Sequence, residues 1–570
     1  MVLDSTRPEP TETSPLLGER DQDGLPVDPD NSIAPAGPAP YDETDAEDNE
    51  TETDLERQPS NGDSFKHQGL PEVRKRMKYI FPAIAIGVFL SSADQTLIVS
   101  TYGIIGTDLK ALSSTSWIAT GYFLTLTAFQ PVYGKLSDIF GRKECLLVAY
   151  LIFGVGSVAC GFARTIGELI AARAFAGIGG GGMSVCTSIL LSDVVSLRDR
   201  GTWQGYINLV YAVGASTGAP IGGLLAESIG WRWSFIAQGP LCLAAFVAVA
   251  AVLQLPRQEE SHWREKLARI DFLGAFILIV AVFGLLVGLD RGSNVGWSRP
   301  ITIAGLCTTP LFVVFVLVEK YVAKHPIAPG HIILDKSLIA CYLCNFFSFA
   351  GWMAAIFFIP LYWQVTGGYS ASRAGLLLVP SIICGVSGSL FAGIYMKRTA
   401  KYYWITVIAY SHLTLGVSVV LLFAGAVMRS LPVMVVGTCV SGFSNGIGVT
   451  TTLIGLIANA SHADQAVATA CSYLFRSLGS VFGVSMCATA FNQTLRASLA
   501  AALRGDKDAE KIAERVRAGL AYYRSLEPHL QAIVRECYGK ATRSALGVSL
   551  VLVSGSAVCA WGINEKRLER

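Results

Sequence analysis

The stretch GKLSDIFGRK, residues 134–143, lies between two apolar blocks and combines two glycines with charged side chains. Gly134 and Gly141 allow close backbone approach and a tight turn. Asp138, Arg142 and Lys143 would form a charge cluster at a membrane face, where it can lock two helices together in one conformation and release them in another. A loop that only sets membrane orientation would supply basic residues without this spacing. We therefore interpret the stretch as a conformational-switch loop.

The apolar blocks beside this loop recur along the whole chain. Of the 570 residues, 52% are hydrophobic and 15% are charged, whereas about a quarter are charged in a typical soluble protein. The blocks are about 20 residues long, which is the length of a helix that crosses a bilayer. The composition predicts an all-α polytopic membrane protein. The 14 predicted transmembrane helices lie near 79–104, 115–134, 144–163, 167–192, 204–226, 232–255, 270–289, 300–318, 338–362, 372–395, 403–427, 432–457, 466–490 and 544–563.

The segment before the first span, residues 1–75, has a different composition. Residues 1–70 carry 18 acidic and 4 basic side chains, a net charge of −14, so the rest of the chain carries +16. Such a segment has too little apolar surface to offset the entropy of ordering, and we predict a disordered acidic tail. It has no basic region followed by an apolar region, so we expect the first span to act as the insertion signal.

A sorting motif lies near the start of this tail. ETSPLL (12–17) has the form of an acidic dileucine signal, with Glu12 followed at the usual spacing by Leu16 and Leu17. A sorting adaptor would bind such a motif as an extended peptide on a cytosolic tail. Short motifs also match by chance, so this one indicates the membrane in which the protein resides only together with other evidence.

The distribution of basic residues predicts the orientation. If the N-terminus is cytosolic, about 22 Lys and Arg lie on the cytosolic side and about 7 in the short loops opposite. Both termini are therefore expected in the cytosol, including a short C-terminus at 564–570. The long loop 492–543 then lies on the non-cytosolic side, with an amphipathic helix expected within it. Asn492 begins a glycosylation sequon on that side, although it lies very near the membrane.

The sequence gives no sign of an enzyme. Twelve of the 13 cysteines lie in apolar segments, where packing is the better interpretation. The seven histidines are scattered. We find no metal-ligand cluster, nucleophile–base constellation or phosphate-binding loop, and we expect no catalytic residue, metal or cofactor. The partners implied are the lipid bilayer and small molecules rather than nucleic acid.

The decapeptide at 134–143 resembles the signature loop of the major facilitator superfamily. LIAARAFAGIGGGG (169–182) resembles the fourth-span motif of that family, which contains a buried arginine, here Arg173. GYINLVYAVGASTGAPIGG (205–223) resembles the antiporter motif of the fifth span. The family usually has Gly-Pro directly, whereas Ala219 intervenes here, which weakens an argument for antiport based on this motif alone. The residues that keep the motif are Gly205, Gly214, Gly218, Pro220, Gly222 and Gly223.

Further stretches narrow the resemblance. GWRWSF (230–235) and FFIPLYWQVTGGYSASRAGLLLVP (357–380) resemble the 14-span drug:proton antiporter group. Three segments look most like fungal vacuolar basic amino acid transporters, namely SADQTLIVSTYGIIGTDL (92–109), TSWIATGYFLTLTAFQPVYGKLSDIFGRK (115–143) and LRDRGTWQGYINLVYA (197–212). The resemblance implies an N-terminal six-helix half (79–255), two extra helices (270–318) and a C-terminal six-helix half (338–563). It also implies inverted three-helix repeats and a site near the membrane midplane.

Asp94, in FLSSADQTLIVSTYGI (89–104), is an acidic residue inside the first predicted transmembrane helix. A charged group at a helix centre costs roughly 2.5–3.5 kcal/mol on insertion scales, and such groups are functional by default. Burial favours the neutral, proton-carrying form, and a carboxylate also attracts a cationic solute. Asp94 is therefore a candidate for proton coupling and for substrate binding. The alternative is an acid hydrogen-bonded to Thr96 or Gln95 for packing only.

Arg173 is the natural counter-charge for Asp94, although a backbone carbonyl is an equally open partner. His412, alone in the eleventh span, is more simply a satisfied polar residue than a coupling group. Other polar residues in the spans either face a cavity or join helices, and the sequence does not separate these roles. The candidates for cavity-lining residues are Gln95, Asn208, Tyr211, Asn345 and Arg476, and Gln238 and Asn445 share their character.

These features predict a proton-coupled antiporter that moves basic amino acids from the cytosol into the vacuole. Returning protons would drive the solute into an acidic lumen. The same fold and orientation at the plasma membrane would make a multidrug or toxin efflux pump. A nutrient sensor that binds without transporting is the alternative from another class.

Overall fold

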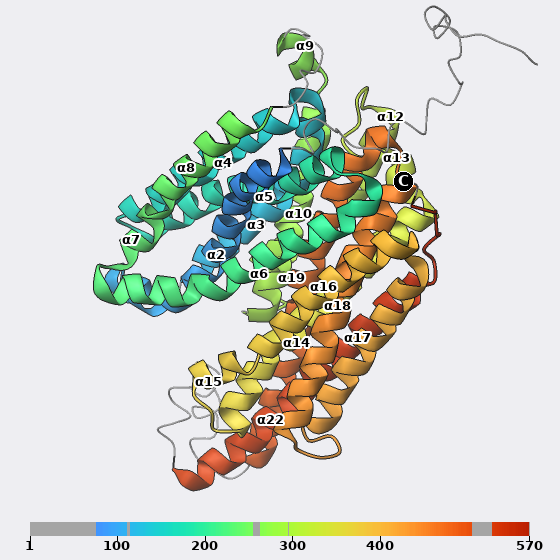
Figure 1. Ribbon diagram of the computed structural model, residues 1–570. Helices are drawn as coiled ribbons and strands as arrows, with labels where there is room; N and C mark the ends of the chain where they lie inside the picture. Colours follow the sequence, from blue (N-terminus) through green and yellow to red (C-terminus); the bar gives the residue numbers. More distant parts are fainter. Residues whose placement is uncertain (1–75, 111–114, 255–262, 295, 504–526, 569–570) are drawn as a thin grey trace, which may run out of the picture. The chain divides into compact units, whose positions relative to one another are not determined.

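The computed structural model describes residues 76–110, 115–254, 263–294, 296–503 and 527–568 (Figure 1). The acidic tail, with Glu12, Leu16 and Leu17, lies outside the described residues, as does the amphipathic helix expected between 492 and 543. The described residues form helices and no β-strand. Helices suit a bilayer because each satisfies its own backbone hydrogen bonds where no water is present.

Thirteen of the described helices are long and apolar enough to cross a membrane. They coincide with the predicted spans except at 115–134. There α3 (Ser116–Phe140) has 25 residues but is not among the 13 apolar spans. The all-α multi-pass architecture is thus confirmed, while the count of 14 stays a prediction.

The first group of helices, blue to green in Figure 1, makes up the N-terminal half. Its strongest contacts join α2 to α6, α3 to α5 and α4 to α5. A connection of one residue, Gly141, separates α3 from α4. Besides α3, this half contains α2 (Met77–Asp108), α4 (Arg142–Phe162), α5 (Ile166–Val194), α6 (Leu197–Ser228), α7 (Trp231–Ile236) and α8 (Gln238–Val252).

The second group, yellow to red, makes up the C-terminal half. Its strongest contacts join α14 to α22, α17 to α18, α16 to α18 and α14 to α19. It contains α14 (Lys336–Thr366), α15 (Ala371–Leu376), α16 (Val379–Thr399), α17 (Tyr403–Phe423), α18 (Leu431–Asn459), the short 3₁₀ turn η3 (His462–Asp464), α19 (Gln465–Ala502) and α22 (Pro528–Ala560).

The two extra spans lie between these halves in sequence, with α10 as the first and α11 plus α12 as the second. The helix α10 contacts α3 of the N-terminal half and α19 of the C-terminal half. It therefore touches both halves. The elements of this segment are α9 (Trp263–Ala268), α10 (Phe272–Asn294), α11 (Pro300–Leu306), α12 (Leu311–Tyr321) and α13 (Gly330–Leu334).

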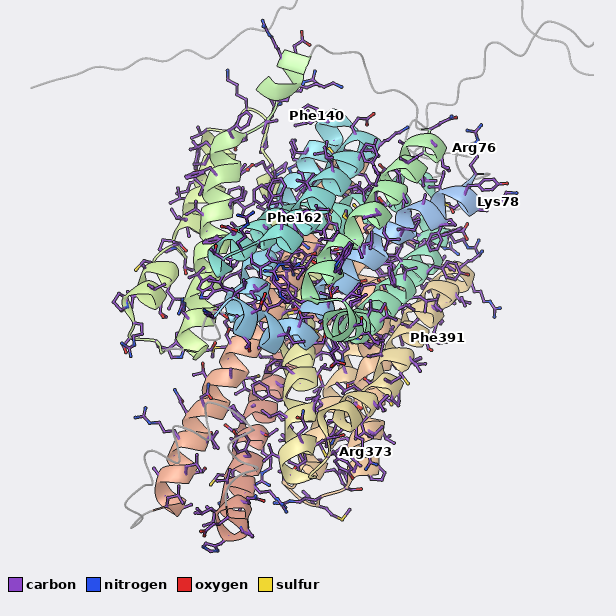
Figure 2. All side chains as sticks on the ribbon, turned by 90° about the vertical axis from the view of Figure 1, so that its left-hand side faces the viewer. Arg76, Lys78, Phe140, Phe162, Arg373 and Phe391 are labelled. Carbon is purple, nitrogen blue, oxygen red and sulfur yellow. The ribbon has the colours of Figure 1, made fainter. Side chains whose placement is uncertain are left out.

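Two ends of the helices are distinguished below. The loop end is the end at which Gly141 joins α3 to α4, and Figure 2 labels Phe140 there. The opposite end is where α4 finishes at Phe162 and α15 begins at Ala371, and Figure 2 labels Arg373 in the lower part of the view. Each crossing of the bundle connects one end to the other.

The two halves repeat one packing device. A Cβ atom on Gly214 or Gly218 of α6 would lie 2.7 or 2.1 Å from a backbone carbonyl oxygen of α2. A Cβ atom on Gly479 or Gly483 of α19 would lie 2.2 or 1.9 Å from a backbone carbonyl oxygen of α14. In both halves only glycine permits this approach, since real side chains do not reach such distances.

The last two spans extend beyond the bounds that hydropathy predicts. The helix α19 continues to Ala502 rather than ending near 490, and α22 begins at Pro528 rather than near 544. Residues 492–502 and 528–543, at the two ends of the expected loop 492–543, are therefore helical. The cause is a separate apolar cluster in which Leu495 and Leu499 of α19 pack with Val534 and Tyr538 of α22. Apolar residues at helical spacing extend a helix where overall hydropathy has already fallen.

Candidate functional site

Asp94 of α2 and Arg173 of α5 form a buried ion pair. The Arg173 Nη1 atom lies 2.5 Å from Asp94 Oδ2, and the two side chains are 0% and 1% exposed. Gln238 at the start of α8 donates a hydrogen bond from Nε2 to Asp94 Oδ1 over 3.1 Å. Three helices thus converge on one carboxylate, and each of its oxygens has a partner.

The guanidinium of Arg173 is held on its other sides as well. Its Nε atom donates to the backbone oxygen of Ile118 over 3.3 Å. The ring centroid of Tyr122 lies 4.3 Å from its Cζ atom, and that of Phe235 lies 5.6 Å away. Aromatic faces stabilise a desolvated cation. Both partners that the sequence left open for Arg173, a carboxylate and a backbone carbonyl, are therefore present.

The hydrogen-bond partners of the alternative interpretation, Gln95 or Thr96, are wrong. Gln95 Nε2 donates instead to the backbone oxygen of Ser91, and Thr96 Oγ1 donates to that of Ala93. Asp94 points away from both neighbours in sequence because the 3.6-residue period of the helix directs adjacent side chains to different faces.

The chemistry of this pair follows from its burial. Removing one partner of a buried ion pair leaves an uncompensated charge and costs about 3–5 kcal/mol. Arg173 and Asp94 therefore stay together unless a proton neutralises the carboxylate or another charge replaces one of them. A proton on Asp94 and the ion pair with Arg173 would compete for the same carboxylate.

The conformational-switch loop is a second ion-pair cluster, at the loop end. Arg142 Nη1 lies 2.5 Å from Asp138 Oδ1, and Arg142 Nε lies 2.7 Å from Asp193 Oδ2 at the end of α5. Gly141 adopts φ +106°, a conformation open to glycine and costly for other residues. Lys143 lies apart and donates to the backbone oxygen of Ala250 over 2.7 Å. One arginine thus ties α3, α4 and α5 together.

Direct contacts join the two halves at the loop end. Lys397 Nζ of α16 lies 2.9 Å from Asp199 Oδ1 of α6. Arg200 Nη1 donates to Gln465 Oε1 at the start of α19 over 3.2 Å. A Cβ atom on Gly134 would lie 2.6 Å from the Cβ atom of Ala470 on α19. The switch-loop helices therefore press directly against the other half.

Two deeper hydrogen bonds continue this seam. Asn208 Nδ2 of α6 donates to Ser389 Oγ of α16 over 2.8 Å. Ser477 Oγ of α19 donates to Gln130 Oε1 of α3 over 3.1 Å. Asn208 is a predicted cavity residue, and here it links the halves. These contacts close the loop end of the interface in this conformation.

The remaining predicted polar residues form two local pairs. Tyr211 OH donates to Gln95 Oε1 over 2.9 Å within the N-terminal half, and the Tyr211 side chain is 42% exposed. In the C-terminal half Arg476 Nε donates to Asn345 Oδ1 over 3.2 Å, and both residues are buried. The structure thus keeps Arg476 with Asn345 and Arg173 with Asp94 in two different bundles.

The antiporter-motif helix is α6, and its residues divide into two sets. Gly214, Gly218 and Gly222 are buried against α2. A Cβ atom on Gly223 would lie 3.5 Å from the nearest atom of Ser100, an ordinary contact distance, so this position tolerates a side chain. Pro220 is inside α6 and exposed. The motif therefore positions α6 on α2, which carries Asp94.

Asn492 lies within α19 rather than in a loop. Its Nδ2 atom donates to the backbone oxygen of Ser293 at the end of α10 over 3.3 Å. A glycan on this nitrogen would break that contact, so we expect the sequon to be unused.

Two residues in these sites give no clear signal in the sequence. Tyr122 stacks on Arg173, but an aromatic residue in an apolar span gives no signal of its own. Asp193 binds Arg142, and it lies one residue beyond the predicted span 167–192, where an acid at a helix end gives no signal of its own. Gln238 is one of the polar residues in the predicted spans, and the structure shows that it contacts Asp94.

Two groups of membrane-length helices that contact each other, with a buried ion pair inside one of them, are typical of membrane transporters. The model of the Major Facilitator Superfamily matches residues 84–484, more than half of the chain, and the chain belongs to that superfamily. The proton:xylose symporter XylE shares this fold, with a TM-score of 0.56 at 14% identity over 87% of this chain and 98% of XylE.

Three relatives from yeasts are similar over most of their length. The vacuolar membrane amino acid uptake transporter fnx2 of Schizosaccharomyces pombe is 37% identical over 86% of this chain and 84% of its own. The multidrug resistance protein fnx1 of the same yeast is 35% identical over 85% and 92%. The vacuolar basic amino acid transporter 2 of Saccharomyces cerevisiae is 33% identical over 78% and 96%. The chain is therefore a multi-pass membrane transporter and not an enzyme.

Proposed function

We propose that this transporter exchanges protons for basic amino acids and moves lysine, arginine or histidine from the cytosol into the vacuole. The observation that carries the proposal is the Asp94–Arg173 pair, the one ion pair among the described residues in which both side chains are fully buried. Two relatives whose names state vacuolar amino acid transport support the substrate class and the membrane.

In this mechanism Asp94 carries the proton. Both of its oxygens are occupied and it is 0% exposed, so a substrate does not reach it in this conformation. A proton that neutralises Asp94 releases Arg173 and weakens the contact between α2 and α5. Loss of the proton restores the pair. Competition between proton and arginine for one carboxylate couples the protonation state to the arrangement of the helices.

The switch loop and the seam supply the alternation. We place the loop end in the cytosol because the basic residues of the chain are concentrated there. Arg142 and the Asp199–Lys397 pair then close the cytosolic side in this conformation. Release of these contacts opens the site to the cytosol, and their return commits the solute to the lumen.

The energetics suit this direction. Exchange of one proton for one monovalent cation is electroneutral, so only the pH difference and the solute gradient do work. Each pH unit is worth about 1.4 kcal/mol, which is a tenfold concentration ratio. A lumen about two units more acidic than the cytosol therefore supports about 100-fold accumulation.

Uptake of labelled lysine, arginine and histidine into sealed vacuolar vesicles supplied with ATP tests the proposal. The expected result is uptake that a protonophore abolishes. Uptake that persists after the protonophore would contradict proton coupling. For the membrane assignment, a tagged protein with Leu16→Ala and Leu17→Ala is expected to leave the vacuole. The sorting claim fails if that variant stays there.

Drug efflux at the plasma membrane is the second candidate, and the similarity to the multidrug resistance protein fnx1 favours it. Both functions use the same fold and orientation. They differ in what disruption of the gene does to cells. Loss of a vacuolar carrier lowers vacuolar basic amino acids, whereas loss of an efflux pump raises sensitivity to cationic toxins without changing vacuolar content.

A further inference from the structure

Arg476 of α19 is a buried cation for which the described part of the chain offers no acidic partner. The residue is 7% exposed, and within the described residues no carboxylate forms an ion pair with its guanidinium. Its contacts are with neutral groups. Nε donates to Asn345 Oδ1 over 3.2 Å, and Nη2 donates to the backbone oxygen of Val449 over 3.2 Å.

The buried arginine of the N-terminal half, Arg173, differs from Arg476 because it has an acidic partner. Arg173 has Asp94 at 2.5 Å, so its charge is neutralised within the protein. Neutral acceptors satisfy part of the Arg476 guanidinium and leave its charge in place. Burying a charge without a counter-charge is unfavourable. The charge of Arg476 is therefore neutralised only when an additional negative group binds to it.

Asn345 is fixed in a way that orients Arg476. Its Nδ2 atom donates to the backbone oxygen of Cys341 and to Ser472 Oγ, each over 3.1 Å. Thr452 Oγ1 donates to Asn345 Oδ1 over 3.3 Å. With both donor hydrogens of the amide engaged, its oxygen must face Arg476. The guanidinium is thus held in one orientation before any ligand arrives.

Arg476 lies on the face of α19 that meets the N-terminal half. Tyr473 packs against the core of the N-terminal half, and Ser477 Oγ donates to Gln130 Oε1 of α3. Residues three and four apart on a helix share a face, so position 476 lies with 473 and 477. The ring of Tyr473 is also 5.1 Å from the Cζ atom of Arg476. The guanidinium itself is held within the C-terminal half, beside two residues of α19 that touch the N-terminal half.

We propose that Arg476, oriented by Asn345, binds the α-carboxylate of the transported amino acid. The inference rests on the proposed function. A planar guanidinium matches a carboxylate in shape and charge. All basic amino acids carry this group, whereas their side chains differ. A carboxylate at Arg476 supplies the missing counter-charge and makes the site selective for amino acids over the amines that lack it.

Competition with cadaverine, which is lysine without its carboxylate, tests the assignment. The assay is uptake of labelled lysine by the full-length carrier in vesicles. For the unmodified protein we expect unlabelled lysine to compete and cadaverine to compete poorly. Arg476→Gln should raise the KM for lysine by about 10- to 100-fold, the value of a charge-assisted contact. It should also remove the preference for lysine over cadaverine.

Two further variants separate ligand binding from folding. Asn345→Asp places a carboxylate on the side chain whose oxygen Arg476 already contacts, so the protein supplies the counter-charge itself. The new ion pair offsets the hydrogen bond to Cys341 that the amide nitrogen loses, so the purified protein should stay folded and still lose lysine uptake. Arg373→Gln removes an exposed positive charge at the opposite end, and it should leave KM and selectivity unchanged.

The outcomes are distinguishable. Unchanged KM and unchanged selectivity in Arg476→Gln, with lysine uptake by the unmodified protein, would overturn the assignment and leave the proposed function standing. An Asn345→Asp variant that transports lysine normally would also overturn it. If the unmodified protein takes up no basic amino acid, the proposed function and the assignment fail together.

Discussion

Asp94→Asn changes one buried atom that contacts Arg173. Oδ2 of Asp94 lies 2.5 Å from Arg173 Nη1, and the substitution puts either a neutral oxygen or an NH₂ group there. The NH₂ group would face another donor, so the amide would turn its oxygen to Arg173. Its nitrogen would then meet Gln238 Nε2, which now donates to Oδ1 over 3.1 Å. Neither orientation satisfies both neighbours.

The magnitude follows from the burial of the pair. Both side chains are at most 1% exposed, so solvent does not compensate the charge left on Arg173. Loss of one partner of such a pair costs about 3–5 kcal/mol. Arg173→Gln should cost a similar amount because it leaves the carboxylate of Asp94 unpaired. In the double variant two amides replace two charges, and most of the lost stability should return.

The assay combines two measurements on the same three variants. Thermal or denaturant unfolding of the purified proteins gives their stabilities, and a double-mutant cycle isolates the interaction between the two residues. We expect a coupling of about 2–3 kcal/mol, at the upper end of values for contacting residues. Initial rates of proton-driven lysine uptake give function. Uptake should be absent in all three variants, including the double variant that folds well.

Two results would refute this reasoning. Additive destabilisation, with no coupling between the substitutions, would show that the pair does not form. Normal proton-driven uptake by a well-folded Asp94→Asn protein would remove Asp94 from proton coupling, since an amide does not titrate.

The remaining predictions concern packing, the switch loop and pH. Gly218→Val puts side-chain atoms beyond a Cβ that already lies 2.1 Å from a backbone oxygen of α2, so folding or uptake should be lost, whereas Gly223→Ala should be tolerated in the same assays. Arg142→Gln leaves two carboxylates unpaired, and the initial rate of uptake should fall at least about tenfold; an unchanged rate would contradict a role in alternation. Arg232 and a neighbouring tryptophan hold the pKa of Asp108 below its ordinary value of 3.8. A lowered carboxyl pKa stabilises the fold above the unfolded pKa and loses this effect as pH falls through the folded pKa. The difference in melting temperature between the unmodified protein and Asp108→Asn should therefore be constant from about pH 5 to 7 and shrink below about pH 4; a difference that already disappears at pH 5 would contradict this sign.

Much of the fold was predictable because a bilayer imposes a simple rule. A helix must be apolar over about 20 residues, so composition alone locates the spans. The bounds were less accessible where packing rather than lipid determines them. Residues 491–502 of α19 and 528–543 of α22 are helical because they pack on each other. A hydropathy window does not register a contact between two segments that are distant in sequence.

The candidate site was predictable as a set of residues but not as a set of contacts. Asp94 and Arg173 stand out because charges are rare inside spans, and the structure joins them. Asp193 and Gln238 did not stand out, since their importance comes from the charges opposite them. Arg476 showed its charge in the sequence, yet only the structure shows that no described acid neutralises it.

Lysine uptake by the purified carrier in liposomes, driven by an imposed pH difference with an acidic interior, is the most direct test of proton exchange. Lysine should accumulate, the interior should become less acid as it does, and a protonophore should stop both. Equal uptake without a pH difference, or equal uptake of neutral and anionic amino acids, would contradict the account.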